Sequence, residues 1–301
     1  MSLGVLNNLS AVYAENSLNN TNNSLSKTLQ QLSSGSKINS GADDAAGLSL
    51  VDGLQANQTA LTQSQTNAQE GVGLLQVADG ALSQVTSLLN RAVTLATEAS
   101  NGTLNTAQDT AADQEYQSIL AEINNIGSTT TYNGNAVFTS TAVNIYTGDS
   151  TSTSASIDAL TIDDLTSAKV GDSGGAVTYT AAAGGTPATI SYAATGAEDL
   201  SATKLDNASD AQTALTDLNA AISDVAAQDG YIGSQINTLS SVSQVMSTQQ
   251  ENIQAAQNAV QATDYAQASS NMSKYEILSQ TGISALAQAN SVQQEVTKLL
   301  Q

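Results

Sequence analysis

Apolar residues form long stripes in helical register near both ends of the chain, and near the C-terminus they repeat every seven positions. This period is typical of amphipathic helices that pack against other helices. The terminal stripes therefore predict helix pairing between the two ends, and further association with other copies. The C-terminal series is Leu278, Ala285, Val292 and Leu299, interleaved with Gly282, Ala289 and Val296, and the N-terminal stripe contains Leu3, Leu6, Leu9, Val12, Leu18, Leu25, Leu29 and Leu32.

The same period continues inward from each end. A series from Leu54 to Ala96 predicts one long helix over 54–99, which Asn101-Gly102 should terminate. A shorter helix is expected over 106–126, folded back antiparallel on the first. Helix resumes near Ala208 and keeps one phase to Leu299, with interruptions expected at 230–233 and 261–264.

Residues 128–205 have a different pattern, rich in Thr, Ser, Ala and Gly. Alternating apolar and polar positions predict strands at 143–146, 157–162, 176–180 and 188–192. Tyr132-Asn133-Gly134-Asn135 is typical of a turn. The segment predicts two small hairpins inserted into a helical protein.

Two joints separate the helical segments. Gly35 is expected to end the first helix, and residues 39–53, with three glycines and a weak Ser40–Asp43 capping box, predict short helical pieces. The polar stretch 261–264 predicts the second joint. The layout is nearly palindromic, so we expect a mainly α fold: a long antiparallel helical rod built from both chain ends, with a small β-rich insertion in the middle.

Composition excludes much chemistry. Histidine, cysteine and tryptophan are absent, which excludes imidazole or thiolate zinc sites and His-dependent catalytic triads. Adjacent acids such as Asp43-Asp44 and Asp163-Asp164 are typical of helix caps and solvated turns, so we expect no enzyme, cofactor or metal. A net charge of −20 argues against a nucleic-acid partner. No signal peptide or apolar membrane span is evident, so we expect no membrane insertion.

Three stretches of the chain resemble bacterial flagellin. Residues 32–40, running into Asp43–Leu48, resemble the N-terminal signature of the family, and Gln65–Leu82 resembles the start of its long inner helix. Asp264-Tyr265, 271–274 and 284–290 resemble its C-terminal signature. The matches cover both ends in order, over about two thirds of the chain.

The resemblance implies a structural subunit that polymerises with itself into the flagellar filament. It implies a terminal coiled-coil domain (1–44 and 262–301) lining the filament channel, an inner helical domain (45–165 and 205–261) and an exposed outer region (166–204). It also implies unfolded passage through the flagellar export apparatus with an export chaperone, without a cleaved signal, and assembly beside hook-associated and cap proteins outside the cell. Subunit contacts would then involve Leu3, Leu6, Leu25, Leu29, Leu32, Leu278, Ala285, Val292, Val296 and Leu299.

Arg91, Leu95 and Glu115 match positions at which some flagellins contact the Toll-like receptor for flagellin. Leu95 lies beside the main seven-residue series, so it could face a partner; contact with the next subunit is the simpler interpretation.

Three alternatives to a purely structural flagellin are a hook–filament junction protein with similar termini, a flagellin carrying a metalloprotease, and an unrelated secreted coiled-coil adhesin. The absence of histidine excludes the HExxH motif of the metalloprotease. The Ser/Thr-rich segment 139–180 allows O-glycosylation, although a solvated, Thr-rich β surface is the favoured explanation.

Overall fold

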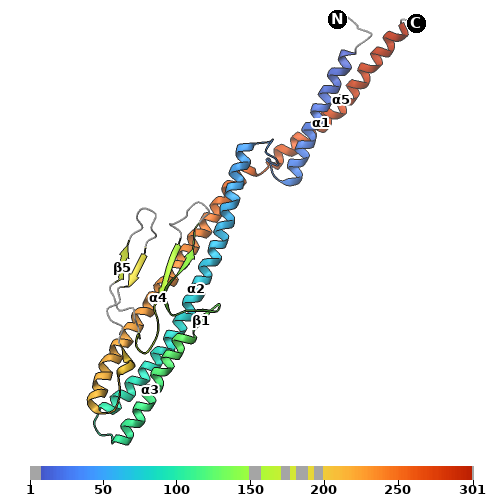
Figure 1. Cartoon of the computed structure of the whole chain (residues 1–301). Helices are drawn as coiled ribbons and strands as arrows, with labels where there is room; N and C mark the ends of the chain where they lie inside the picture. The colour runs from blue at the N-terminus through green and yellow to red at the C-terminus, as the bar shows by residue number, and fades with distance from the viewer. Residues whose placement is uncertain (1–7, 149–156, 171–176, 181–188, 193–198, 300–301) are drawn as a thin grey trace. The chain divides into compact units, whose positions relative to one another are not determined.

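The computed structural model describes residues 8–148, 157–170, 177–180, 189–192 and 199–299 (Figure 1). Its helices are α1 (Leu9–Ser34), α2 (Ala45–Ser100), α3 (Thr106–Thr129), α4 (Ala208–Gln261) and α5 (Tyr265–Leu299), with a short 3₁₀ turn η1 at Leu200–Ala202. The strands are β1 (Thr131–Tyr132), β2 (Asn135–Ala136), β3 (Thr139–Tyr146), β4 (Ile157–Ile162), β5 (Val177–Thr180) and β6 (Thr189–Tyr192). The mainly α fold expected from the sequence is confirmed.

The chain forms two compact units. The terminal unit contains residues 1–56 and 252–301, and the inner unit contains residues 57–251. Both borders lie inside α2 and α4, about ten residues beyond the expected borders at 44/45 and 261/262. The expected short helical pieces over 45–53 are wrong, because α2 already begins at Ala45. Asp44 accepts the Gly47 amide at 2.9 Å, as a residue capping that helix does.

The core of the inner unit is the seam between α2 and α4. Gln65 on α2 donates to Ser247 on α4 at 2.8 Å, and Gln250 donates to Thr62 at 2.6 Å, so the two helices run antiparallel. The predicted seven-residue series is buried, with residues such as Leu75, Leu82 and Leu89 at most 1% exposed. Helix α4 remains continuous through 230–233, so the expected interruption there is wrong; Tyr231 and Ile232 are buried in the seam.

Helix α3 lies alongside α2, as expected, after the turn at Asn101-Gly102 (Figure 1). Asn105 caps α3 by accepting the amides of Ala107 and Gln108, while Gln108 accepts the Asn105 amide in return. Tyr116 and Ile123 on α3 are fully buried. The helix pair thus becomes a three-helix core, which widens the buried stripe of α2.

The β-rich segment forms three separate antiparallel hairpins: β1–β2, β3–β4 and β5–β6. The predicted turn is confirmed by left-handed backbone at Asn133 (φ 50°) and Gly134 (φ 80°). The β3–β4 hairpin packs on α2, where Ser64 donates to the Gly148 carbonyl at 2.6 Å and Asn67 donates to the Tyr146 carbonyl at 3.1 Å. The β3–β4 hairpin is therefore part of the inner unit.

The expected outer region, 166–204, is anchored at both of its ends. Ser167 exchanges two hydrogen bonds with Asn124 of α3, and Val170 and Leu200 are 0% exposed. The Tyr116 hydroxyl lies 2.5 Å from the Thr203 hydroxyl, and burial raises the pKa of Tyr116. These ends belong to the inner core; residues 171–176, 181–188 and 193–198 lie outside the described part.

Helix α2 contains the one stretch, among the described residues, that is long and apolar enough to meet a compositional criterion for a membrane span. The expectation that the chain contains no such stretch is therefore wrong. Its apolar side chains, including Leu75, Ala78 and Leu82, line the protein core. Packing in the bundle therefore explains the apolar character of α2.

Among the described glycines, Gly127 on α3 has the closest backbone neighbour. A Cβ atom there would lie 1.9 Å from the Leu165 carbonyl oxygen. Since a backbone atom cannot rotate away, we predict that Gly127→Ala lowers the free energy of unfolding by about 2–3 kcal/mol. Thermal or urea unfolding of the full chain measures this. Gly53→Ala is the control, because no described atom lies within 4 Å of its Cβ position; an equal loss in both variants would contradict the packing argument.

Candidate assembly interface

The terminal unit contains an antiparallel pair of helices, α1 and α5, drawn from opposite ends of the chain. Asn8 donates to the Ala289 carbonyl at 3.0 Å, and Ser279 donates to Asn22 at 3.1 Å. The helices approach closely at Gly282, where a Cβ atom would lie 3.1 Å from Leu18. The predicted pairing of the two chain ends is thus present within one subunit.

The two interleaved C-terminal series have different environments. Gly282 and Ala289 are half-buried on the side that faces α1. Leu278 and Val292 are each 43% exposed, and Ala285 between them is also exposed. One series therefore forms the contact within the subunit, and the other is apolar surface.

Exposed apolar side chains occur all around α5. At 100° per residue, Leu278, Ala285 and Val292 lie on one flank of the α1 contact, Ile283 lies on the other, and Ile277 points away from it. Helix α1 exposes Leu9, Val12, Tyr13 and Leu29, whereas Leu25 and Leu32 are half-buried. Ten of the thirteen exposed large apolar residues in the described part of the chain belong to the terminal unit.

Four of the predicted contact residues cannot be placed. Leu3 and Leu6 lie outside the described residues, as do the side chains of Val296 and Leu299. We call the exposed large apolar residues that are described on α1 and α5, together with Ala285 of the seven-residue series, the terminal apolar surface: Leu9, Val12, Tyr13, Leu29, Tyr265, Ile277, Leu278, Ile283, Ala285 and Val292.

The joint between α1 and α2 is hydrogen-bonded to the joint between α4 and α5. Ser36 and Ala262 form an antiparallel bridge; the Lys37 amide donates to the Gln261 carbonyl at 2.8 Å, and the Thr263 amide donates to the Gly35 carbonyl at 3.0 Å. Gly35 has the expected left-handed conformation (φ 73°) at the end of α1. The two predicted joints are therefore one structural feature.

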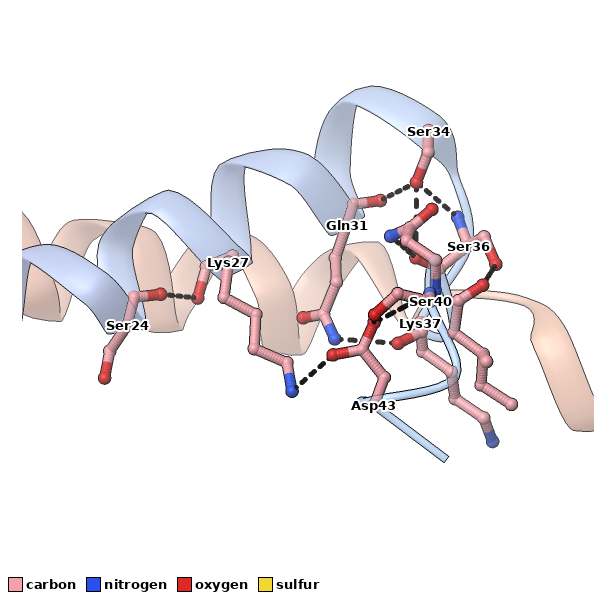
Figure 2. A network of polar contacts seen from close by, with 11 residues as sticks. Ser24, Lys27, Gln31, Ser34, Ser36, Lys37, Ser40 and Asp43 are labelled. Carbon is pink, nitrogen blue, oxygen red and sulfur yellow. Dashed lines mark hydrogen bonds and ion pairs between the residues drawn. The ribbon is translucent and has the colours of Figure 1, made fainter. Parts of the chain in front are cut away.

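Asp43 is the centre of this joint (Figure 2). Its carboxylate pairs with the Lys27 ammonium at 2.8 Å and accepts the amides of Asn39 and Ser40, both at 3.1 Å. Ser40 also donates its hydroxyl at 3.2 Å. The predicted Ser40–Asp43 contact thus exists, but it closes the turn before α2 and does not cap the helix.

The hydrogen bond from Lys27 and the backbone amide of Asn39 lower the pKa of Asp43 from 3.8 to about 2. A pKa that is lower in the folded state stabilises the joint above pH 3.8, and this contribution is lost as the pH falls towards 2. We predict that Lys27→Met raises the pKa of Asp43 towards 3.8, measured by NMR titration of its carboxyl carbon.

Lys37→Met is the matched control for this titration, because it removes the same charge from the same joint without contacting Asp43. The control should leave the pKa of Asp43 near 2. Equal shifts in both variants would show that general charge, and not the Lys27 contact, sets this pKa.

The predicted contact residues of the inner unit, Arg91, Leu95 and Glu115, are only partly exposed. Arg91 on α2 and Glu115 on α3 form an exposed ion pair, with Nη2 to Oε1 at 2.6 Å. Leu95 is only 4% exposed, so the expectation that its side chain faces a partner is wrong. Leu95 lies one position before Ala96, which belongs to the seam. The packing of α3 against α2 extends the protein core over this flank of α2.

Two family profiles match this chain. Residues 5–142 match the bacterial flagellin N-terminal helical region, and residues 215–300 match the bacterial flagellin C-terminal helical region. The chain is 31% identical to a flagellin of Listeria innocua over 97% of this chain and 98% of that protein. It is also 39% identical to polar flagellin C of Vibrio parahaemolyticus, over 44% of this chain and 35% of the relative.

The match with a crystal structure of Bacillus cereus flagellin covers 64% of this chain and 94% of that chain, with 26% identity and a TM-score of 0.44. The sequence matches define a filament-forming structural protein of the flagellum. The chain belongs to the bacterial flagellin family, as its terminal signatures predicted, and it is a structural subunit of the flagellar filament.

Proposed function

We propose that the terminal apolar surface forms the contacts that hold copies of this subunit together in the filament. The observation that supports this most directly is the exposed apolar residues on several sides of α5. Apolar side chains on several sides of one helix are buried only when several neighbours cover them. Subunits in a helical lattice have such neighbours, because each contact joins two different surfaces and the assembly does not close.

The charge distribution supports the same division of roles. The terminal unit has seven acidic and four basic residues, whereas the inner unit has twenty acidic and three basic ones. Like charges oppose close packing of copies and favour contact with water. We therefore assign the channel lining to the nearly neutral terminal unit, and the filament wall to the inner unit.

Export and assembly partners follow from this assignment. We propose passage through the flagellar export apparatus with an export chaperone, and assembly outside the cell beside hook-associated and cap proteins. An isolated pair of helices is marginally stable in water, so the terminal unit is suited to fold fully only when neighbours cover it. The absence of cysteine is compatible with export that requires no oxidative folding.

The exposed Arg91–Glu115 pair is proposed as a contact between neighbouring inner units. Its use by the Toll-like receptor for flagellin is secondary, because the third residue of that pattern, Leu95, is buried. A receptor would therefore have to read the ion pair without the leucine.

A charge on the terminal apolar surface tests the proposed contact. We predict that Leu278→Glu raises the concentration needed for seeded filament growth roughly 100-fold, because a carboxylate would be buried unpaired between subunits. Electron microscopy and sedimentation of seeded reactions measure it. Gln280→Glu adds the same charge at a polar, exposed position on the same helix and should polymerise normally. Normal filaments from Leu278→Glu would refute the proposed interface.

The anchored ends of the outer region make a second prediction. Replacing residues 177–192, the β5–β6 hairpin with its loop, by a short linker should leave filaments intact. Replacing the whole of 166–204 should lower the melting temperature of the inner unit by several degrees, because Val170 and Leu200 each lose a fully buried position. Calorimetry of the unassembled chains compares the two. Equal melting temperatures would mean that the ends contribute nothing to the core.

A further inference from the structure

Three glycines of the inner unit lie in the middle of long helices where packing does not require them. No described atom lies within 4 Å of the Cβ position at Gly80 on α2, or at Gly230 and Gly233 on α4. A glycine inside a helix lowers the local helix equilibrium about fivefold relative to alanine. Each of these positions therefore weakens its helix without permitting a close contact.

Other glycines of the same inner unit differ from these. A Cβ atom at Gly71 would lie 3.2 Å from both Ile145 and Leu239, and one at Gly73 would lie 3.1 Å from the Tyr132 hydroxyl. Those two positions allow the β3–β4 hairpin, α4 and the β1–β2 turn to approach α2. Close packing thus explains them, and it leaves Gly80, Gly230 and Gly233 unexplained.

The three open glycines lie at one level of the α2–α4 seam. Gly80 follows Asp79, and Gly230 follows Asp229; the exposed carboxyl groups of the two aspartates lie close to each other across the helices. This contact, with burial, raises the pKa of Asp229, so the ionised pair is repulsive.

A buried polar group weakens the seam further at this level. Gln228 is only 3% exposed, and its Oε1 has no hydrogen-bond partner among the described residues. It occupies a seam position that is alanine two and one heptads earlier, at Ala214 and Ala221. A buried acceptor without a donor favours any opening that admits water.

We propose that residues 77–82 of α2 and 227–234 of α4 form a compliant level of the inner unit, at which the bundle opens locally while the seam on either side stays closed. Three independent features coincide there: glycines that packing does not need, a carboxyl pair and an unsatisfied amide oxygen. The seam on either side lacks this combination; Val85, Leu89 and Ala92 are fully buried on α2, as are Ala214, Leu218 and Ala221 on α4. A subunit that must fit neighbours in a lattice can deform at this level without unfolding elsewhere.

Hydrogen exchange of the unassembled full chain, read by mass spectrometry, tests the proposal. Backbone amides of 79–81 and 229–233 should exchange on the order of tenfold faster than those of 86–92 and 215–222. Gly80→Ala, Gly230→Ala and Gly233→Ala should each slow local exchange about fivefold. Gln228→Leu should slow it too, by removing the unsatisfied oxygen.

Gly71→Ala is the matched control, because it makes the same change in the same helix where the Cβ is crowded. The crowded methyl group of this variant should strain the packing, so the backbone amides near residue 71 should exchange faster. Equal protection along α4 would overturn the proposal, as would alanine variants that leave local exchange unchanged or a Gly71→Ala variant that slows it equally. The measurement does not involve filaments, so its failure is separate from failure of the proposed subunit contacts.

Discussion

The two long helix pairs of this structure depend on one constraint: apolar stripes from the two halves of the chain must meet in antiparallel seams. Within the terminal unit the constraint joins α1 to α5, and within the inner unit it joins α2 to α4. The β3–β4 hairpin and α3 then pack against α2, as the contacts of Ser64 with Gly148 and of Arg91 with Glu115 show. The inner seam is completed inside one chain; the terminal seam is not.

The incomplete terminal seam connects the fold to the polymer. The α1–α5 contact uses small or half-buried residues such as Gly282 and Ala289, while larger apolar side chains such as Ile277 and Leu278 stay exposed. A pair of helices cannot bury apolar residues on several sides of one member. With the subunit contacts proposed above, further copies would bury the remaining surface, and subunit stability would then be linked to assembly.

Sequence reasoning succeeded where periodicity or turn chemistry dominates. The heptads predicted all five long helices, Asn133-Gly134 predicted a turn, and Gly35 predicted the end of α1. It failed where tertiary packing outweighs a local signal. Glycines at 47, 230 and 233 suggested breaks, yet α2 and α4 remain continuous at these positions because they pack along their whole seams. Leu95 suggested a surface residue from its heptad position, because the pattern of one helix does not show that a third helix covers its flank.

The joint shows a limit of another kind. The sequence marks both 35–44 and 261–264 as irregular, but neither pattern shows that the segments pair or that Lys27 reaches Asp43. These contacts join residues that no short-range period relates. The same long-range geometry separates the glycines: Gly71 and Gly80 look alike in sequence, and only the neighbours of each Cβ distinguish a glycine that permits packing from one that packing does not need. In a chain built from continuous seams, a glycine of the second kind marks a place where rigidity is reduced.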